Sequence, residues 1–224
     1  LARLWRRMGI CHLLLDGVPD RARESWCNAG RAWLDCVTQA REPDRAAARS
    51  FAVFDALLAR DEATALAISR GLPAAPTAGS DLDDACFVLF ACACFDPQRE
   101  ASRPALIEQW EEGLGEGDDP RIEVCAGLLE RDAARFHDGM ALWVNALVAD
   151  IETRVKEGSL DPEAAATEAN VSVEGLLMLD FAERAGIALT EDYPMLPSIA
   201  RLSRRTPLPD ADAWTRIDSY RQFS

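Results

Sequence analysis

Apolar residues recur at steps of three and four along residues 118–158, which is the period of an amphipathic α-helix. The long stripe in the second half of this stretch consists of Phe136, Met140, Trp143, Leu147 and Ile151. A shorter stripe precedes it and consists of Ile122, Val124, Cys125, Leu128 and Leu129. We therefore expect a helical hairpin here, and we interpret the rest of the chain as packed around it.

The same spacing predicts helices along most of the chain, whereas alternation with the period of two that β-strands show is hard to find. The expected helices span 2–17, 20–41, 44–59, 62–69 and 85–95, followed by one around Trp110, a short alanine-rich one starting at 159–162, one from Ser172 to Gly186 and a last one near 198–203. Residues 85–95 are apolar on every side, so we expect this helix at the centre of the core. Ser80 is the expected cap of this helix, and residues 72–79 are the clearest loop.

A partial internal repeat supports a stack of hairpins. Five residues from Val53 to Asp61 recur between Val124 and Asp132 at an offset of 71. In both places a Leu-Leu pair ends one helix and an aspartate caps the next, as in repeated helical hairpins. The sequence thus predicts an all-α fold of stacked antiparallel hairpins resembling tetratricopeptide-type repeats. No fixed 34-residue consensus is present, and chance matching in a chain rich in alanine and leucine is the alternative.

The length of 224 residues suits one domain better than two. We expect a single helical domain over residues 1–205, and two lobes, 1–72 and 80–205, are the alternative division. Residues 206–224 combine prolines with alternating charge, which predicts a loosely held tail. Because the first residue is not methionine, the native start can lie upstream of Leu1.

The formal charge of −14 arises from 38 acidic and 24 basic residues. A surface this acidic repels nucleic acids and anionic membranes and attracts basic proteins, so we expect neither of the first two as partners. Acidity that serves solubility alone is the simpler interpretation. No segment approaches the roughly 20 apolar residues of a membrane span.

The N-terminus resembles a signal peptide in one respect, because three arginines precede the apolar run from Ile10 to Leu15. His12 interrupts that run, Asp16 ends it and no small-residue cleavage site follows. The sequence therefore predicts a cytoplasmic protein. The seven cysteines are scattered and mostly lie among apolar residues, which is typical of structural cysteines in a reducing compartment.

The chain contains no sequence motif for nucleophilic catalysis, for phosphate or dinucleotide binding, or for metal binding. The two histidines, His12 and His137, lie within expected helices and are too few for a Cys/His metal set. We therefore expect no enzyme, no catalytic residue, no cofactor and no metal site. The segment from Glu111 to Asp119 carries several carboxylates but lacks the ligand ladder of an EF-hand, so it is read as a solvated turn or as part of a partner-binding surface.

The C-terminal half, over about residues 105–200, resembles the Imm49-like group of bacterial immunity proteins. The matching features are the acidic Trp110 helix, the Asp119-Pro120-Arg121 start, the turn from Leu128 to Asp132 with Phe136 after it, the segment Val173–Leu177, Gly186 and Tyr193-Pro194. The helical antidotes of PoNe-type nucleases are similar in class, but their Tyr-Trp-rich C-terminal motif is missing here. The resemblance implies an antitoxin that neutralises a toxin used between competing bacteria.

Taken together, charge and resemblance favour an immunity protein that binds a basic cognate toxin, such as a nuclease. The expected contact residues are Glu111, Glu112, Glu116, Asp118 and Asp119, with Glu191, Asp192 and Tyr193 as a second patch. A helical-repeat scaffold that binds a peptide or another cytoplasmic protein is the alternative. The sequence leaves the oligomeric state and the activity of the toxin open.

Overall fold

A computed structural model of the chain describes residues 1–40, 46–77, 79–189, 192–201 and 206–216. The described part is all-α and holds no strand. Its helices are α1 (Ala2–Cys11), α2 (Pro19–Gln39), α3 (Ala52–Leu58), α4 (Glu62–Gly71), α5 (Leu82–Phe95), α6 (Arg103–Leu114), α7 (Pro120–Glu130), α8 (Ala133–Lys156), α9 (Pro162–Ala166) and α10 (Val173–Ala185). Not one of these helices is both long and apolar enough to cross a membrane.

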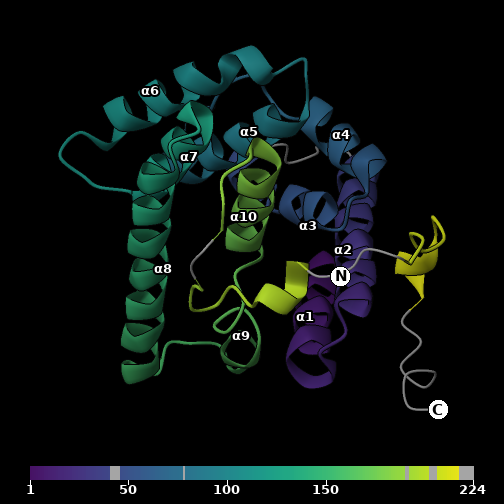
Figure 1. Cartoon of the computed structure of the whole chain (residues 1–224). Helices are drawn as coiled ribbons and strands as arrows, with labels where there is room; N and C mark the ends of the chain where they lie inside the picture. Colours follow the sequence, from purple (N-terminus) through teal and green to yellow (C-terminus); the bar gives the residue numbers. More distant parts are fainter. Residues whose placement is uncertain (41–45, 78, 190–191, 202–205, 217–224) are drawn as a thin grey trace.

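Helices that follow one another in the chain pack together, most closely α7 against α8 and α1 against α2. Figure 1 shows α10 enclosed by the others: α8 stands on one side, α5 and α6 lie above it, and α2 and α4 stand on the other side. α10 contacts both α3 and α7 and thereby joins the two halves of the chain. The expected all-α fold of packed hairpins is confirmed.

The core is organised around α5, as its all-round apolar sequence predicts. Every residue from Ala85 to Ala93 is buried. The ring of Phe87 lies with its centroid 5.1 Å from that of Phe54, 6.1 Å from that of Trp110 and 5.4 Å from that of Trp143. One side chain of α5 therefore contacts α3, α6 and α8 at once, and such aromatic pairs add to the stabilisation from apolar burial.

The predicted repeat is visible as two turns of the same geometry. Arg60 and Arg131 both adopt the left-handed conformation, with φ of 62° and 57°. In each turn the next aspartate donates its N–H to a carbonyl five residues back, and its carboxylate then accepts an N–H from the following helix. This closure of one helix and capping of the next is the arrangement expected at Asp61 and Asp132.

Three expected helix boundaries are wrong. α1 ends at Cys11, and the five residues His12–Asp16 form a π-helix that Gly17 closes in the left-handed conformation. The expected helix over 44–59 is divided into a short 3-10 segment, Ala47–Arg49, and α3, because the Ser50 hydroxyl bonds the Ala46 carbonyl between them. Residues 44 and 45 lie outside the described residues.

The third boundary concerns α5, whose cap is Asp81 and not Ser80. The Asp81 carboxylate accepts the Asp84 N–H, while the Ser80 hydroxyl donates to the Thr77 carbonyl inside the preceding turn. A carboxylate is at least as good a cap as a hydroxyl, so a shift by one residue costs the helix nothing.

The segment 206–216, which we call the strap, was expected to be loosely held, but it is bonded to the first two helices. Its main-chain carbonyls accept hydrogen bonds from Trp5 on α1 and from Arg23 and Arg31 on α2. Side-chain donors that lie far away in the sequence therefore fix this part of the tail. The sequence of the strap alone does not indicate these donors. Residues 217–224 lie outside the described part of the chain.

Candidate partner-binding surface

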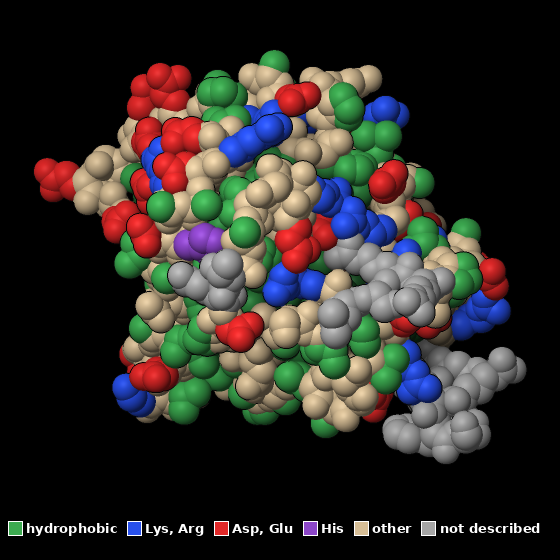
Figure 2. Space-filling view, viewed as in Figure 1, with side chains coloured by type: hydrophobic (Ala, Val, Ile, Leu, Met, Phe, Trp, Pro, Cys, Tyr) green, Lys and Arg blue, Asp and Glu red, His purple; other side chains and the backbone are tan. Residues whose placement is uncertain are grey.

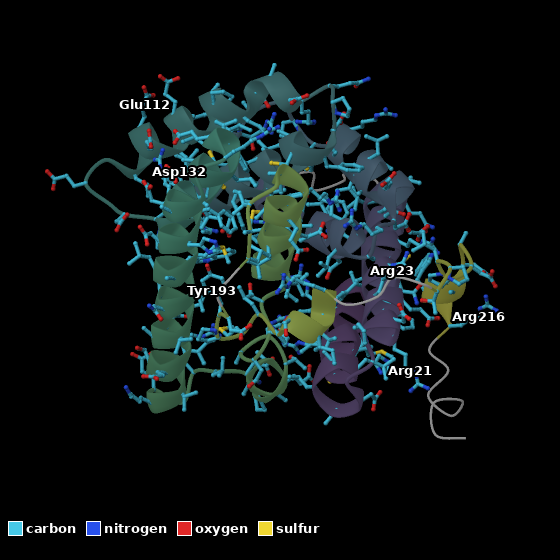
Figure 3. The ribbon with its side chains drawn as sticks, in the orientation of Figure 1. Arg21, Arg23, Glu112, Asp132, Tyr193 and Arg216 are labelled. Carbon is cyan, nitrogen blue, oxygen red and sulfur yellow. The ribbon has the colours of Figure 1, made fainter. Side chains whose placement is uncertain are left out.

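The C-terminal end of α6 and the connection to α7 form an exposed acidic corner, which we define as Glu111, Glu112, Glu116 and Asp118. All four residues are exposed. Figure 2 shows acidic side chains gathered at this corner, and Figure 3 labels Glu112 at its outer edge. Within the described part of the chain, none of the four forms an ion pair or a side-chain hydrogen bond, so their charge is directed to the solvent.

Local geometry holds this corner away from the core. α6 ends at Gly115, whose φ of 59° is in the left-handed region that favours glycine. Two residues earlier, a Cβ on Gly113 would lie 1.9 Å from Leu82 Cδ2, so glycine lets the end of α6 approach the start of α5 without displacing the Leu82 side chain. The acidic connection therefore begins beside the junction of two packed helices.

Asp119 lies next to the corner but has a structural role, and its expected exposure is wrong. It is only 9% exposed and caps α7 by accepting the Arg121 N–H at 3.0 Å. The Arg121 guanidinium pairs with Asp119 at 2.7 Å and with Asp84 at 2.8 Å. The same guanidinium lies over the rings of Phe87 and Trp110. Asp119 thus belongs to a partly buried charge network whose negative charge is largely neutralised internally.

A further carboxyl beside this network, that of Asp83, has its pKa shifted chiefly by burial. Partial burial raises the pKa of Asp83, and the nearby carboxylates of Asp119, Asp81 and Asp84 add to that effect, although Arg121 opposes it. Burial disfavours the charged form of a carboxyl, and neighbouring carboxylates do the same.

Other acids close to the corner are neutralised inside the α7–α8 hairpin. Arg135 on α8 pairs with Glu123 at 2.7 Å and with Glu130 at 2.8 Å. The hydrogen bond from Arg135 lowers the pKa of Glu123, although burial opposes the shift. Asp132, labelled in Figure 3, caps α8. These acids are paired with Arg135, whereas the acids of the acidic corner are not paired. The acidic corner is therefore the part of this region that can attract a basic partner.

The second expected patch is only partly a surface. Asp192 is exposed, and Glu191 lies outside the described residues. Tyr193 is 8% exposed, and its hydroxyl lies 2.5 Å from His137 Nδ1 on α8. Because His137 Nε2 bonds the Ala188 carbonyl, Nε2 carries the proton and Tyr193 donates to Nδ1. Tyr193 therefore holds the segment after α10 against α8, and its expected exposure is wrong.

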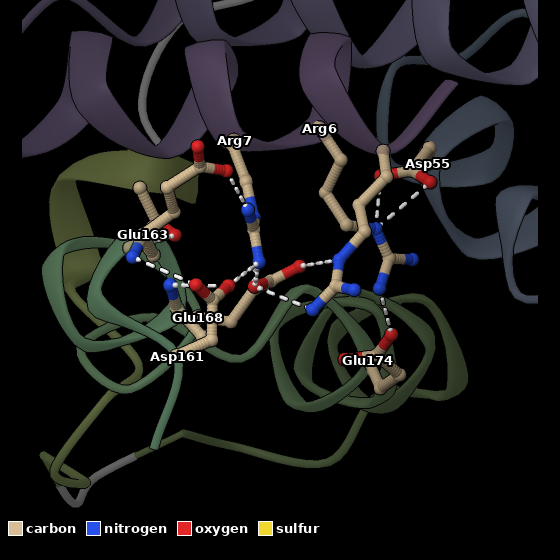
Figure 4. Close-up of polar contacts among 10 residues, drawn as sticks. Arg6, Arg7, Asp55, Asp161, Glu163, Glu168 and Glu174 are labelled. Atoms are coloured by element: carbon tan, nitrogen blue, oxygen red, sulfur yellow. Dashed lines mark hydrogen bonds and ion pairs between the residues drawn. The ribbon is translucent and has the colours of Figure 1, made fainter. Parts of the chain in front are cut away.

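The structure also shows a charge network that the sequence analysis did not find. Arg6 on α1 pairs with Asp55 of α3 at 2.9 Å and with Glu174 of α10 at 2.5 Å (Figure 4). Its neighbour Arg7 pairs with Asp161, Glu163 and Glu168 around α9. We call these seven residues the arginine clamp.

The clamp changes the protonation of its buried member. Burial raises the pKa of Asp55 to about 7, and Glu174 and Glu168 add to this, while Arg6 opposes it. One guanidinium shared by two carboxylates leaves one of them undercompensated. The sequence signal for the clamp was the placement of two arginines beside the apolar stripe of an amphipathic helix, where charged groups need partners.

The buried cysteines are poorly suited to nucleophilic or metal chemistry in this fold. All seven cysteines are free, and burial raises the pKa of Cys92 to about 12 and that of Cys86 to about 11. Thiols held protonated in this way are poor nucleophiles and poor metal ligands. Among the residues that the structure describes, no group of three His, Cys, Asp or Glu side chains is arranged to hold a metal ion.

Comparison of the chain with family models, with curated proteins and with solved structures finds no match in any of the three.

Proposed function

We propose that this protein is a cytoplasmic immunity protein that binds a basic effector toxin through its acidic corner and neutralises it. The observation that carries the proposal is the contrast between paired and unpaired carboxylates. Arg121 pairs with Asp84 and Asp119 and Arg135 pairs with two acids of α7, whereas the four acids of the corner are exposed and unpaired in the described part of the chain. The family resemblance of residues 105–200 supports the same function.

The physical argument concerns the nature of the partner. A toxin that acts on nucleic acid carries a basic surface because it must bind phosphates. Unpaired carboxylates on an exposed connection attract such a surface over distances up to the Debye length of about 8 Å at physiological salt. Complementary charge mainly raises the association rate and excludes wrong partners, while apolar contacts at the centre of the interface supply most of the affinity.

The experiment is co-expression with the product of the gene that neighbours this one, which the proposal expects to be a toxin, followed by binding measurements with the purified proteins. The wild-type chain should restore growth and form a complex. Failure of both would refute the immunity function, irrespective of which surface binds.

Charge reversal then tests the acidic corner itself. The variant Glu112→Lys with Glu116→Lys should lower the association rate at low salt on the order of tenfold. The matched control, Glu152→Lys with Glu157→Lys, changes the net charge equally at the far, exposed end of α8. Equal rates for the two variants would show that the toxin binds another face.

A further inference from the structure

Two arginines of α2 each serve two parts of the molecule at once. Arg23 donates from Nε to the Ala59 carbonyl at 2.7 Å and from Nη1 to the Thr206 carbonyl of the strap at 2.6 Å. Arg31 donates from Nε to the Asp61 carboxylate at 2.7 Å and from Nη1 to the carbonyls of Pro209 and Asp210, both at 2.8 Å. One edge of each guanidinium thus belongs to the domain, and the other binds the strap.

The inner edge of each arginine is fixed by rigid structure. Asp61, which holds Arg31, is 3% exposed, caps α4 and also accepts hydrogen bonds from Cys27 and Thr64. Ala59 belongs to the same left-handed turn at Arg60. The outer edges are therefore held in position whether or not the strap is bound, and such preorganisation reduces the entropic cost of binding.

The outer edges contact only the main chain of the strap. Three carbonyls of residues 206–210 accept from the two arginines, and the Trp214 carbonyl accepts from Trp5 Nε1 at 2.9 Å. Two residues of this segment, Pro207 and Pro209, have no N–H to satisfy, which suits the two arginines because they offer only donors. Extended proline-containing segments are recognised in this way because their backbone is preformed and their carbonyls point outwards.

The strap does not fill its site. A cleft of about 470 Å³ lies between α2 and the strap, lined by Asp20, Arg21, Arg23 and Glu24 on one side and by residues 206–210 on the other. The cleft therefore has room beyond what the strap occupies.

We propose that α2 carries a binding site for an extended, proline-containing segment of a partner protein, and that the strap occupies this site in its absence. Arg23 and Arg31 recognise the carbonyls of the incoming segment, and the strap is a competing ligand within the chain. Figure 3 shows Arg23 on the opposite side of the molecule from Glu112, so binding at the acidic corner leaves this second site uncovered. The proposal stands independently of the immunity function.

The first test uses the full chain and a labelled peptide with the sequence of residues 206–216. The variant Leu208→Asp with Trp214→Ser removes the two largest apolar side chains of the strap, both of which are partly buried, and leaves both arginines intact. Because a tethered ligand competes at a high effective concentration, the peptide should bind this variant at least about tenfold more tightly than the wild type. Equal binding to the wild type and the folded variant would overturn the proposal.

The second test asks whether the arginines recognise the peptide. In the same variant, Arg23→Lys with Arg31→Lys keeps the positive charge beside Asp61, but an ammonium group has no second edge for the carbonyls. Peptide binding should be lost in this double lysine variant. Arg21 lines the same cleft but forms no hydrogen bond with the strap, so Arg21→Lys should preserve peptide binding. Unchanged binding to the double lysine variant would overturn recognition by the two arginines.

A third measurement covers the case in which the Leu208→Asp, Trp214→Ser chain does not fold. In the otherwise wild-type chain, the N–H groups of Ala213, Thr215 and Arg216 are hydrogen-bonded within the strap, so their exchange with deuterium reports its opening. Arg23→Lys with Arg31→Lys should accelerate this exchange relative to Arg21→Lys. Equal exchange would show that the arginines do not hold the strap.

Discussion

The α7–α8 hairpin depends on two glycines that allow its helices to touch, and replacing either with alanine should separate them. A Cβ at Gly127 on α7 would lie 2.5 Å from the Phe136 nitrogen and 2.7 Å from its Cα on α8. A Cβ at Gly139 on α8 would lie 2.7 Å from the Val124 nitrogen on α7. All three obstacles are backbone atoms, which cannot move aside as the end of a side chain can.

The expected magnitude follows from two opposing effects. Forcing an extra carbon into a close-packed interface typically costs about 1–3 kcal/mol, and contact with the backbone favours the upper part of that range. Alanine recovers up to about 1 kcal/mol of helix propensity. We therefore expect Gly127→Ala and Gly139→Ala each to reduce the free energy of unfolding by about 2 kcal/mol. Because one separation of the helices accommodates both methyl groups, the double variant should lose less than the sum.

The assay is urea unfolding followed by circular dichroism, with Gly71→Ala as the matched control. Gly71 ends α4, and a Cβ there meets no atom within 4 Å. Alanine at this position should leave stability unchanged or raise it by up to about 1 kcal/mol. If Gly127→Ala and Gly71→Ala have the same effect, the close contact between α7 and α8 is not what positions the hairpin.

Two further predictions concern the arginine clamp. Arg6→Met removes the guanidinium that Asp55 and Glu174 share, so it should lower the free energy of unfolding in urea by about 3–5 kcal/mol. Adding Asp55→Asn to the Arg6→Met chain should recover much of that loss, and no recovery would contradict the pairing of Arg6 with Asp55. Asp55 has its pKa raised, chiefly by burial, from 3.8 to about 7, so its stabilising contribution is complete below about pH 4 and is lost as the pH rises through 7. As the pH rises from 4 to 8, Asp55→Asn should therefore gain stability relative to the wild type. A difference in the free energy of unfolding that stays constant over this range would refute the raised pKa of Asp55.

The features that sequence predicted well are those in which one local pattern decides the outcome. The apolar run from Ala85 to Ala93 could only be buried, and α5 is indeed the centre of the core. The Leu-Leu turns before Asp61 and Asp132 have the predicted closure and capping. In each case the deciding interactions lie within a few residues, so periodicity and capping rules suffice.

The features that sequence did not predict depend on contacts between distant residues. Asp119 looked like one more acid of an exposed turn, and its burial depends on Arg121 lying over rings from α5 and α6. Tyr193 looked exposed beside a proline, but it bonds His137, 56 residues away. The arginines of α1 resembled the start of a signal peptide until the fold brought five acids to them. Charge and hydropathy indicate that such residues need partners, but only the fold identifies the partners.

The arginine clamp has a consequence for the order in which the chain matures during synthesis. Arg6 and Arg7 leave the ribosome long before most of their partners, because Asp161 lies 154 residues after Arg7 and Glu174 lies 168 residues after Arg6. The α1–α2 hairpin can form early and Arg6 can pair with Asp55 once α3 is made, yet Arg7 meets its acidic partners only when residues 161–168 have been synthesised. α1 therefore reaches its final surroundings late, and a ribosome that stalls before residue 161 holds a nascent chain in which Arg7 still lacks these partners.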